Sequence, residues 1–311
     1  MSQIKADDPF AADVLAGLLS PEKTISSRWL YDRRGSELFE DITTLEEYYP
    51  TRTELAILER HAASIAERIG RNAVLVEYGA GAATKTRTLL SALQDLEAYA
   101  PIDISADFLE QTAAVLRREY PGLTVTPIAA DFIDGLESDL LPKTAGRRAG
   151  FFPGSTIGNM DDEQILSFLR SARDGLGRDA CFVLGADLKK SADVLIPAYD
   201  DARGVTAAFN LNLLTRINRE LGANFDLGSF RHEARWNEDR SRIEMHLVST
   251  KAQKVTLLGE ELSFEEGETI HTENSRKFRT EDLERLASQS GWRMTETWFD
   301  DDRYFCIAMF E

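Results

Sequence analysis

The hydrophobic pattern changes its period near residue 73. From there on, short apolar runs typical of β-strands are separated by segments in which apolar residues recur with helical spacing. The expected strands lie at 73–78, 99–105, within 123–132, within 149–159 and at 181–188, and the expected helices lie at 84–93, 106–120 and 162–176. Strands that alternate with crossover helices form a parallel, doubly wound sheet. The sequence therefore predicts an α/β, Rossmann-like fold.

The segments after residue 194 depart from this pattern. Residues 205–221 are expected to form a long helix, and the β-like segments that follow it are typical of an inserted α+β subdomain. After an expected helix at 279–289, the chain ends in two strands joined by the acidic turn 300–302. Such a hairpin closes the sheet with a terminal antiparallel strand. An insertion after a late strand can cover the carboxyl edge of a parallel sheet, where ligands of open α/β folds bind.

The first 70 residues have a mostly helical pattern. Leu38, Ile42 and Leu45 form an apolar helix face, and Pro50 is expected to end that helix. Thr51 and Glu54 have the spacing of a capping box, which predicts that a second helix begins at Thr51.

Three parts of the chain follow from these patterns. Residues 1–70 are expected to form an N-terminal helical segment. Residues 71–194 and 277–311 are expected to form the sheet domain, and residues 195–276 an inserted subdomain.

Composition narrows the class of protein. The 311 residues are 43% hydrophobic and 29% charged, as in soluble globular proteins, and the net charge is −17. A surface this acidic disfavours DNA or RNA as the main partner, because phosphate binding needs a basic surface. The polar start is unlike a secretory signal, and no apolar run reaches the roughly 18 residues of a membrane span. We therefore expect a cytoplasmic monomer that binds a small molecule.

The cysteines and histidines give no sign of a metal site. Cys181 and Cys306 lie in apolar strand-like runs and are expected to be buried free thiols. No pattern of cysteine and histidine has the spacing of metal ligands. None of the four histidines is assigned a role.

The first expected strand leads into a glycine-rich turn. Gly79 and Gly81 allow a tight turn and a close approach of the backbone to a ligand, and the helix start that follows offers free N–H groups. A dinucleotide fingerprint needs Gly or Ala where Thr84 stands, which disfavours an NAD-dependent oxidoreductase. Glu77 instead completes an E-x-G-x-G pattern, which resembles motif I of class I S-adenosylmethionine (SAM) methyltransferases.

Two acids at later strand ends favour a nucleoside ligand. Asp103 ends the second expected strand, where a carboxylate can accept both ribose hydroxyls. Asp131 ends the third, where it can accept from an adenine amino group. Taken singly, Asp103 also suits a helix N-cap and Asp131 a turn.

Five longer strings are more specific. They are YDRRGSELFEDITTLEEYYPTRTE at 31–54, PGSTIGN at 153–159, AYDD at 198–201, FNLNLL at 209–214 and TENSRKF at 272–278. Together they resemble the ergothioneine-pathway L-histidine Nα-methyltransferase family, from about residue 25 to the end of the chain. That family has a class I methyltransferase domain with a substrate-binding insertion, and it adds three methyl groups in turn to give hercynine. The resemblance implies that residues 71–194 and 277–311 form the SAM-binding domain and that residues 195–276 are the substrate-binding subdomain. It also implies that residues 1–70 form a flap over the active site.

The resemblance implies roles for individual residues. The positions that match residues around SAM are Gly79, Lys85, Asp103, Asp131 and Phe132, with Lys85 placed to pair with the methionine carboxylate. Asn159 and Tyr199 match residues that hold the backbone end of the amino acid. Tyr48, Glu273 and Ser275 match residues around the imidazole, and Met245 matches a methionine that lines the same pocket. No metal is implied.

The chemistry of these side chains agrees with the implied roles. Glu273 and Ser275 are two residues apart on an expected strand and so face the same side, where a carboxylate and a hydroxyl can bind one polar ring. Without the resemblance, Glu273 and Ser275 suit a solvent-facing edge strand, Asn159 a turn, Tyr199 a helix surface and Met245 the core. Two alternatives stay open: an N-methyltransferase of another amino acid or amine, and a non-catalytic SAM-binding regulator.

Overall fold

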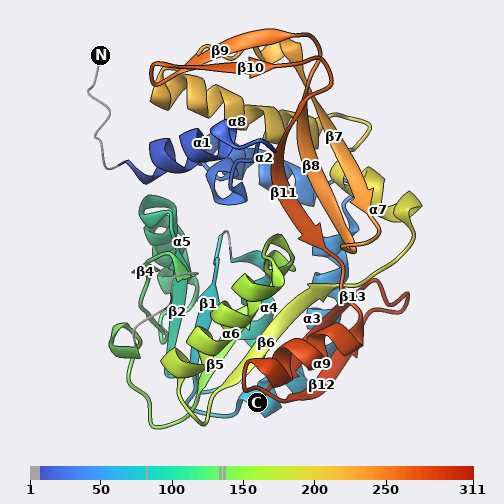
Figure 1. The fold of residues 1–311 in the computed structure, drawn as a ribbon. Helices are drawn as coiled ribbons and strands as arrows, with labels where there is room; N and C mark the ends of the chain where they lie inside the picture. The colour runs from blue at the N-terminus through green and yellow to red at the C-terminus, as the bar shows by residue number, and fades with distance from the viewer. Residues whose placement is uncertain (1–7, 82, 133–134, 136–137) are drawn as a thin grey trace. The chain divides into compact units, whose positions relative to one another are not determined.

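The computed structural model describes residues 8–81, 83–132, 135 and 138–311 (Figure 1). The chain divides into two compact units, each built from separate stretches of sequence. Unit 1 comprises Met1–Tyr49 and Lys190–Arg276, and unit 2 comprises Pro50–Lys189 and Lys277–Glu311. The residues expected to form one N-terminal segment are therefore shared between the units, with the division after Tyr49.

Unit 2 is built on one mostly parallel sheet. Among the described residues this sheet has eight strands in the order β12-β13-β6-β5-β1-β2-β3, with β4 beside β2. The strands are β1 Val74–Tyr78, β2 Ala98–Asp103, β3 Thr124–Val125, β4 Ile128–Ala129, β5 Arg148–Phe152, β6 Cys181–Asp187, β12 Met294–Phe299 and β13 Phe305–Phe310. Strands β1 to β6 pair in parallel, whereas β13 is antiparallel to both β6 and β12. The expected doubly wound sheet with a terminal antiparallel hairpin is confirmed.

Helices pack on both faces of this sheet. They are α3 Tyr49–Ile69, α4 Thr84–Ala92, α5 Ala106–Glu119, α6 Asp162–Leu176 and α9 Thr280–Gln289, with the short 3-10 helices η3 Ser138–Leu140 and η4 Thr156–Asn159. Successive side chains of β1 point to opposite faces. Val74 and Val76 pack with the buried side chains of α6 and α9, and Leu75 packs with those of α3, α4 and α5. Each face thus has its own apolar core.

The start of α3 differs from the sequence prediction. The helix begins at Tyr49, Pro50 lies in its first turn, and Thr51 lies inside the helix, so the expected capping box is wrong. Proline is well tolerated in a first turn, because the N–H that it lacks would have no partner within the helix. Glu54 does not reach back to a cap; its carboxylate is buried. The helix belongs to unit 2 because Leu58 and Ile65 pack into the sheet core.

Unit 1 combines helices with a small antiparallel sheet. Its helices are α1 Pro9–Leu19, η1 Ser27–Leu30, α2 Arg33–Thr43, α7 Ala192–Tyr199, α8 Val205–Leu221 and η5 Leu227–Ser229. Its strands are β7 Phe230–Asn237, β8 Arg242–Ser249, β9 Gln253–Leu257, β10 Glu260–Phe264 and β11 Thr269–Arg276. Strands β11, β8 and β7 form one antiparallel sheet in that order, and β9 pairs with β10. The long helix expected at 205–221 is confirmed.

Carboxylates hold the starts of two helices in unit 1. Asp32 accepts a hydrogen bond from the backbone N–H of Gly35 in the first turn of α2. Asp201 accepts from the N–H groups of Val205 and Thr206 at the start of α8. These bonds satisfy N–H groups that have no partner within a helix.

Both cysteines are buried and free, as expected from the sequence. Burial raises the pKa of the Cys181 thiol to about 11 and raises that of Cys306 further. Both thiols therefore stay protonated at neutral pH. Within the described residues, the helices are too short or too polar to span a bilayer.

Candidate active site

The glycine-rich turn after β1 leaves its backbone open. Gly79 and Gly81 have φ values of +72° and +48°, in the left-handed region that favours glycine. An added Cβ at Gly79 would lie 3.8 Å from the ring of Phe132, whereas one at Gly81 would meet nothing within 4 Å. Helix α4 starts directly after this turn. A ligand can therefore approach the Gly81 backbone closely.

Asp103 and the 131–132 pair lie at the same edge of the sheet as this turn. Asp103 accepts from the N–H of Gly81 at 3.4 Å and from that of Ser105 at 3.0 Å. Asp131 and Phe132 follow β4, which pairs with β2 beside Asp103. The structure thus brings together Gly79, Gly81, Asp103, Asp131 and Phe132, at the carboxyl ends of β1, β2 and β4 in unit 2.

Glu77 lies beneath this turn and is fully buried. Its carboxylate accepts hydrogen bonds from Thr86 Oγ1 at 2.6 Å and from the Tyr99 hydroxyl. Burial raises the pKa of Glu77 to about 7, although the two hydrogen bonds and the charge of Lys85 oppose the rise. These contacts tie the first turn of α4 to β2, so Glu77 supports the glycine-rich turn from inside the protein.

Lys85 lies in the first turn of α4, and Asn159 lies in η4. The Nζ atom of Lys85 is 2.6 Å from Oε2 of Glu54. Asn159 ends η4, which follows β5 at the same carboxyl edge. Ser155, just before η4, has a φ of +57°, and its hydroxyl accepts from the N–H of Asp187 at 2.9 Å. This bond helps to place the segment that carries Asn159.

Tyr199 and Ser275 meet inside unit 1. Their hydroxyl oxygens are 2.7 Å apart, and both residues are buried. The ring of Tyr48 lies 6.0 Å from that of Tyr199, at an angle of 69°. Three of the residues expected from the sequence therefore form one contiguous cluster.

Glu273 and Met245 belong to the same face of the unit 1 sheet. In the antiparallel pair of β11 with β8, Glu273 stands opposite Met245 and Ser275 stands opposite Ile243. Residues directly opposite each other in such a pair share a face. The register shift between His271 and Glu273 leaves 273–275 regular, so Glu273 and Ser275 share that face, as predicted. Met245 is buried and Glu273 is half-buried.

His232 is a residue that the sequence reasoning missed. Its Nε2 lies 2.8 Å from the backbone oxygen of Tyr199, and its Nδ1 lies 2.9 Å from the amide nitrogen of Asn210. An amide N–H₂ can only donate, so Nδ1 accepts and Nε2–H donates to Tyr199. Burial lowers the pKa of His232, which favours this neutral ring. The alternation of Phe230, His232 and Ala234 with charged residues in β7 was the available signal.

Tyr31 and Arg34, which the sequence left without a role, behave differently. The ring of Tyr31 packs edge-on against those of Phe39 and Phe209, and its centroid lies 5.5 Å from each of theirs. The ring of Phe39 in turn packs against that of Tyr48, and the two ring centroids are 6.2 Å apart. Tyr31 therefore belongs to the aromatic packing behind Tyr48. Arg34 is more than half exposed and pairs with Glu37.

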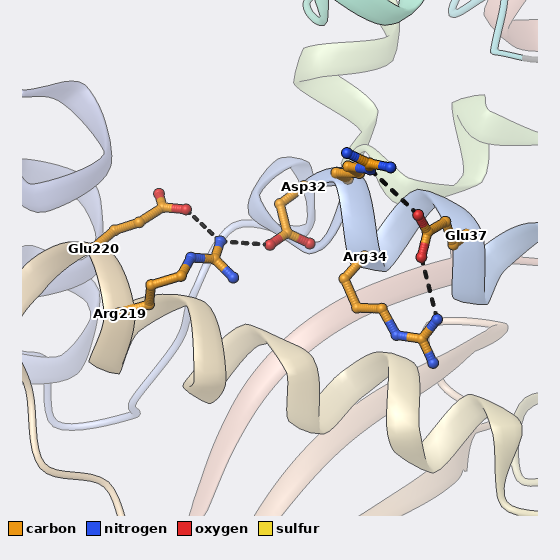
Figure 2. A pocket seen from close by; sticks show the side chains of 6 residues that line it. Asp32, Arg34, Glu37, Arg219 and Glu220 are labelled. Atoms are coloured by element: carbon orange, nitrogen blue, oxygen red, sulfur yellow. Dashed lines mark hydrogen bonds and ion pairs between the residues drawn. The ribbon is translucent and has the colours of Figure 1, made fainter.

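Unit 1 contains a cavity of about 560 Å³, and none of its lining residues was assigned to SAM or histidine from the sequence. The cavity is lined by Asp32, Arg33, Arg34, Glu37, Arg219 and Glu220 (Figure 2). Figure 2 shows the guanidinium of Arg219 between the carboxylates of Asp32 and Glu220. Asp32 also accepts from Asn212 of α8. The charged groups here pair with one another and join α2 to α8, which is a structural role.

The opposite face of the unit 1 sheet carries a pair of stacked histidines. The rings of His246 and His271 are 4.9 Å apart and nearly parallel. Burial, followed by the charge of His271, lowers the pKa of His246 to about 4. Both rings are thus neutral at physiological pH.

Comparison with known proteins assigns the chain to a family. A family model described as "Histidine-specific methyltransferase, SAM-dependent" matches residues 10–311. The chain is 43% identical over 309 residues to the histidine N-alpha-methyltransferase of Mycolicibacterium smegmatis, covering 98% of this chain and 95% of that protein.

Two further relatives extend the comparison. The histidine N-alpha-methyltransferase of Mycobacterium tuberculosis is 40% identical, over 96% of this chain and 93% of that protein. Ergothioneine biosynthesis protein 1 of Neurospora crassa is 31% identical, over 88% of this chain and 32% of that protein. The match of the family model across nearly the whole sequence agrees with these relatives, and the chain belongs to the family of SAM-dependent, histidine-specific methyltransferases.

Proposed function

We propose that this enzyme transfers methyl groups from SAM to the α-amino nitrogen of L-histidine. The product is Nα,Nα,Nα-trimethylhistidine, or hercynine, an intermediate in ergothioneine biosynthesis. Family membership and the names of the bacterial and fungal relatives support this assignment. One structural observation supports histidine as the substrate: Tyr199 and Ser275 are hydrogen-bonded, and Glu273 lies on the same sheet face as Ser275.

The side chains at the carboxyl edge of the unit 2 sheet fit SAM. The Gly81 backbone is open to a ligand, and Asp103 uses only part of its acceptor capacity on two N–H groups. A carboxylate has about four acceptor sites, so Asp103 can also accept both ribose hydroxyls. Asp131 and Phe132 would hold the adenine. Lys85 would pair with the methionine carboxylate, and the bond from Thr86 to Glu77 would help to hold the helix turn that carries Lys85.

The cluster in unit 1 fits an amino acid with a polar ring. A neutral imidazole has one donor and one acceptor nitrogen. Glu273 can accept from the ring N–H. Ser275 can donate to the other nitrogen when the Tyr199 hydroxyl is the donor in the bond between them. Tyr48 lies beside Tyr199 as an aromatic wall. We assign Met245 to the apolar side of this pocket, and Asn159 and Tyr199 to the amino-acid end of histidine.

The methyl transfer itself needs little acid–base chemistry. When bound, SAM would supply a methyl group activated on its sulfonium. The α-amine of histidine would accept this group, with the carbon–sulfur bonding pair returning to sulfur, and would lose one proton before each further transfer. An α-amino group has a pKa of about 8 in a peptide, so its deprotonation is a modest cost at physiological pH and needs no strong base. The protein's part is to align the amine, which can supply several kcal/mol.

The test is a reaction of the purified enzyme with SAM and each of the twenty amino acids, followed by mass spectrometry. Hercynine formed from histidine alone is the expected result. Methylation of a different amino acid would favour the alternative substrate class, and the absence of any methylated product would contradict both readings. We further propose a monomer in the cytoplasm, where a reducing environment suits the two free thiols.

A further inference from the structure

Glu54 is a fully buried carboxylate outside the set of residues assigned so far. It lies in α3 of unit 2, and its exposed fraction is 0%. Its two oxygens lie 3.0 and 2.9 Å from the backbone nitrogen of Gly154, and Oε2 lies 2.6 Å from Nζ of Lys85. One buried side chain thus holds both a lysine assigned to SAM and the backbone just after β5.

Two glycines make room for this arrangement. A Cβ on Gly185 of β6 would lie 2.1 Å from Oε1 of Glu54, which is closer than any real contact. A Cβ on Gly154 would lie 3.2 Å from Nζ of Lys85, and the φ of Gly154 is +82°. The backbone of β6 and that of the turn after β5 therefore leave room for the Glu54–Lys85 pair.

The burial of the pair is uneven. The Glu54 side chain has no exposed surface, whereas 18% of the Lys85 side chain is exposed. An ammonium has three N–H donors, so a lysine that donates to a carboxylate on its buried side keeps donors for a ligand on its open side. A lysine stem is otherwise flexible, and the buried anion fixes where its charge lies.

We propose that Glu54 is a positioning residue for the cofactor: it holds Lys85 Nζ and the Gly154 backbone in the geometry that receives the carboxylate end of SAM. This inference rests on the proposed function, because it takes Lys85 as the partner of that carboxylate. Glu54 itself touches no reacting atom.

Two possible effects of the Glu54 carboxylate, its negative charge and its positioning of Lys85, predict opposite changes in cofactor affinity when it is removed. By Coulomb's law alone, loss of a negative charge near Lys85 strengthens the binding of a second carboxylate. If Glu54 acts by positioning Lys85, its removal weakens that binding instead. The sign of the change in affinity therefore decides between them.

The experiment measures binding by titration calorimetry with two ligands. S-adenosylhomocysteine carries the same amino-acid end as SAM, whereas 5′-methylthioadenosine has the nucleoside and lacks that end. In Glu54→Gln we expect S-adenosylhomocysteine to bind about tenfold or more weakly, as for loss of a charged hydrogen bond. The affinity for 5′-methylthioadenosine should change by less than about twofold, because its contacts do not involve Lys85.

Three further variants sharpen the test. Glu54→Asp keeps the charge but is one methylene too short to reach both partners, so it should also weaken S-adenosylhomocysteine. In a Lys85→Gln background, Glu54→Gln should cause a smaller loss than in the wild type, because the part of its effect that acts through Lys85 is already gone. Leu58→Ala, one turn further along α3 and fully buried, is the matched control: it lowers the melting temperature and leaves both affinities unchanged.

The outcomes separate this inference from the proposed function. A wild-type protein that does not bind S-adenosylhomocysteine contradicts the proposed function and this inference with it. Normal binding by the wild type with equal or tighter binding by Glu54→Gln overturns only the role of Glu54. Wild-type affinity in Glu54→Asp would likewise overturn it, because the charge would then suffice without the geometry.

Discussion

The hydroxyl of Tyr199 lies 2.7 Å from the hydroxyl of Ser275, although 76 positions separate the two residues in the sequence. Either oxygen can be the donor, because both hydroxyls can donate and accept. The two hydroxyl groups can therefore act on a ligand together, each as a donor or an acceptor. A neutral imidazole, which has one donor and one acceptor nitrogen, suits the Ser275 hydroxyl of this pair.

Removal of either hydroxyl should weaken histidine binding. Ser275→Ala and Tyr199→Phe are each expected to raise the KM for histidine about tenfold, with little change in the KM for SAM. The double variant should lose less than the sum of the two effects, because each change already breaks the shared bond. Steady-state kinetics of the four proteins provide the measurement. Fully additive losses would show that the two hydroxyls act independently.

Glu273 should contribute to histidine binding by accepting a hydrogen bond from the ring N–H. Glu273→Gln keeps the shape and removes the charge, so we expect the histidine KM to rise about tenfold or more, as for loss of a charged hydrogen bond. Calorimetric titration with S-adenosylhomocysteine should give the wild-type affinity. An unchanged affinity for histidine in this variant would place the imidazole elsewhere.

His232 should act on the substrate through Tyr199. Its Nε2–H donates to the backbone oxygen of Tyr199, and the amide nitrogen of glutamine can take the place of Nε2. We expect His232→Leu to raise the histidine KM several-fold and His232→Gln to restore most of the wild-type value. The comparison of the two variants at equal folded fraction, checked by circular dichroism, is the measurement. Equal losses in both would indicate a packing role.

Glu77 should make unit 2 less stable as the pH rises. The pKa of Glu77 is about 7 in the folded chain and 4.5 as its ordinary value. The folded protein therefore holds this proton more tightly than the unfolded chain, which stabilises it fully below pH 4.5 and progressively less as the pH rises through about 7. Relative to Glu77→Gln, the wild type should lose about 3 kcal/mol of unfolding free energy over that range. Urea denaturation at several pH values measures it, and parallel curves for the two proteins would contradict it.

His246 should have the opposite effect in unit 1. Its folded pKa is about 4, below the ordinary 6.5, so the unfolded chain takes up the proton first. The neutral histidine costs no stability above pH 6.5, and stability falls as the pH drops from 6.5 towards 4. His246→Phe keeps a ring against His271 and should remove on the order of 1 kcal/mol of this acid sensitivity, allowing for solvent screening. Thermal unfolding between pH 4 and 7 tests the difference.

Most of the sheet of unit 2 was predictable from the sequence. Its strands are short apolar runs at regular spacing, and local periodicity is enough to recognise them. The segment at 49–54 was not, because Thr51 and Glu54 also have the spacing of a capping box. What decides against that cap is the long-range bond from Glu54 to Gly154, 100 positions away, which no local pattern contains.

The candidate site was also predictable only where its arrangement depends on local geometry. Glu273 and Ser275 share a face because strand geometry is local. The bond from Tyr199 to Ser275 joins α7 to β11 and the bond from His232 to Tyr199 joins β7 to α7, so both depend on how the elements pack. The resemblance to a family assigned both Tyr199 and Ser275 to the substrate. The alternation in β7 indicates only that His232 is buried, and it does not indicate the bond to Tyr199.

The discontinuity of unit 1 has a consequence for biosynthesis. Asp32, near the start of the chain, is paired with Arg219, 187 positions later, and β11 completes the sheet only at Arg276. Unit 2 likewise needs Phe310 of β13 beside β6. Unit 1 therefore cannot close until the ribosome has made β11, nor unit 2 until it has made β13, and contacts this distant in sequence form slowly. The emerging chain is expected to need protection from aggregation until these two strands have been made.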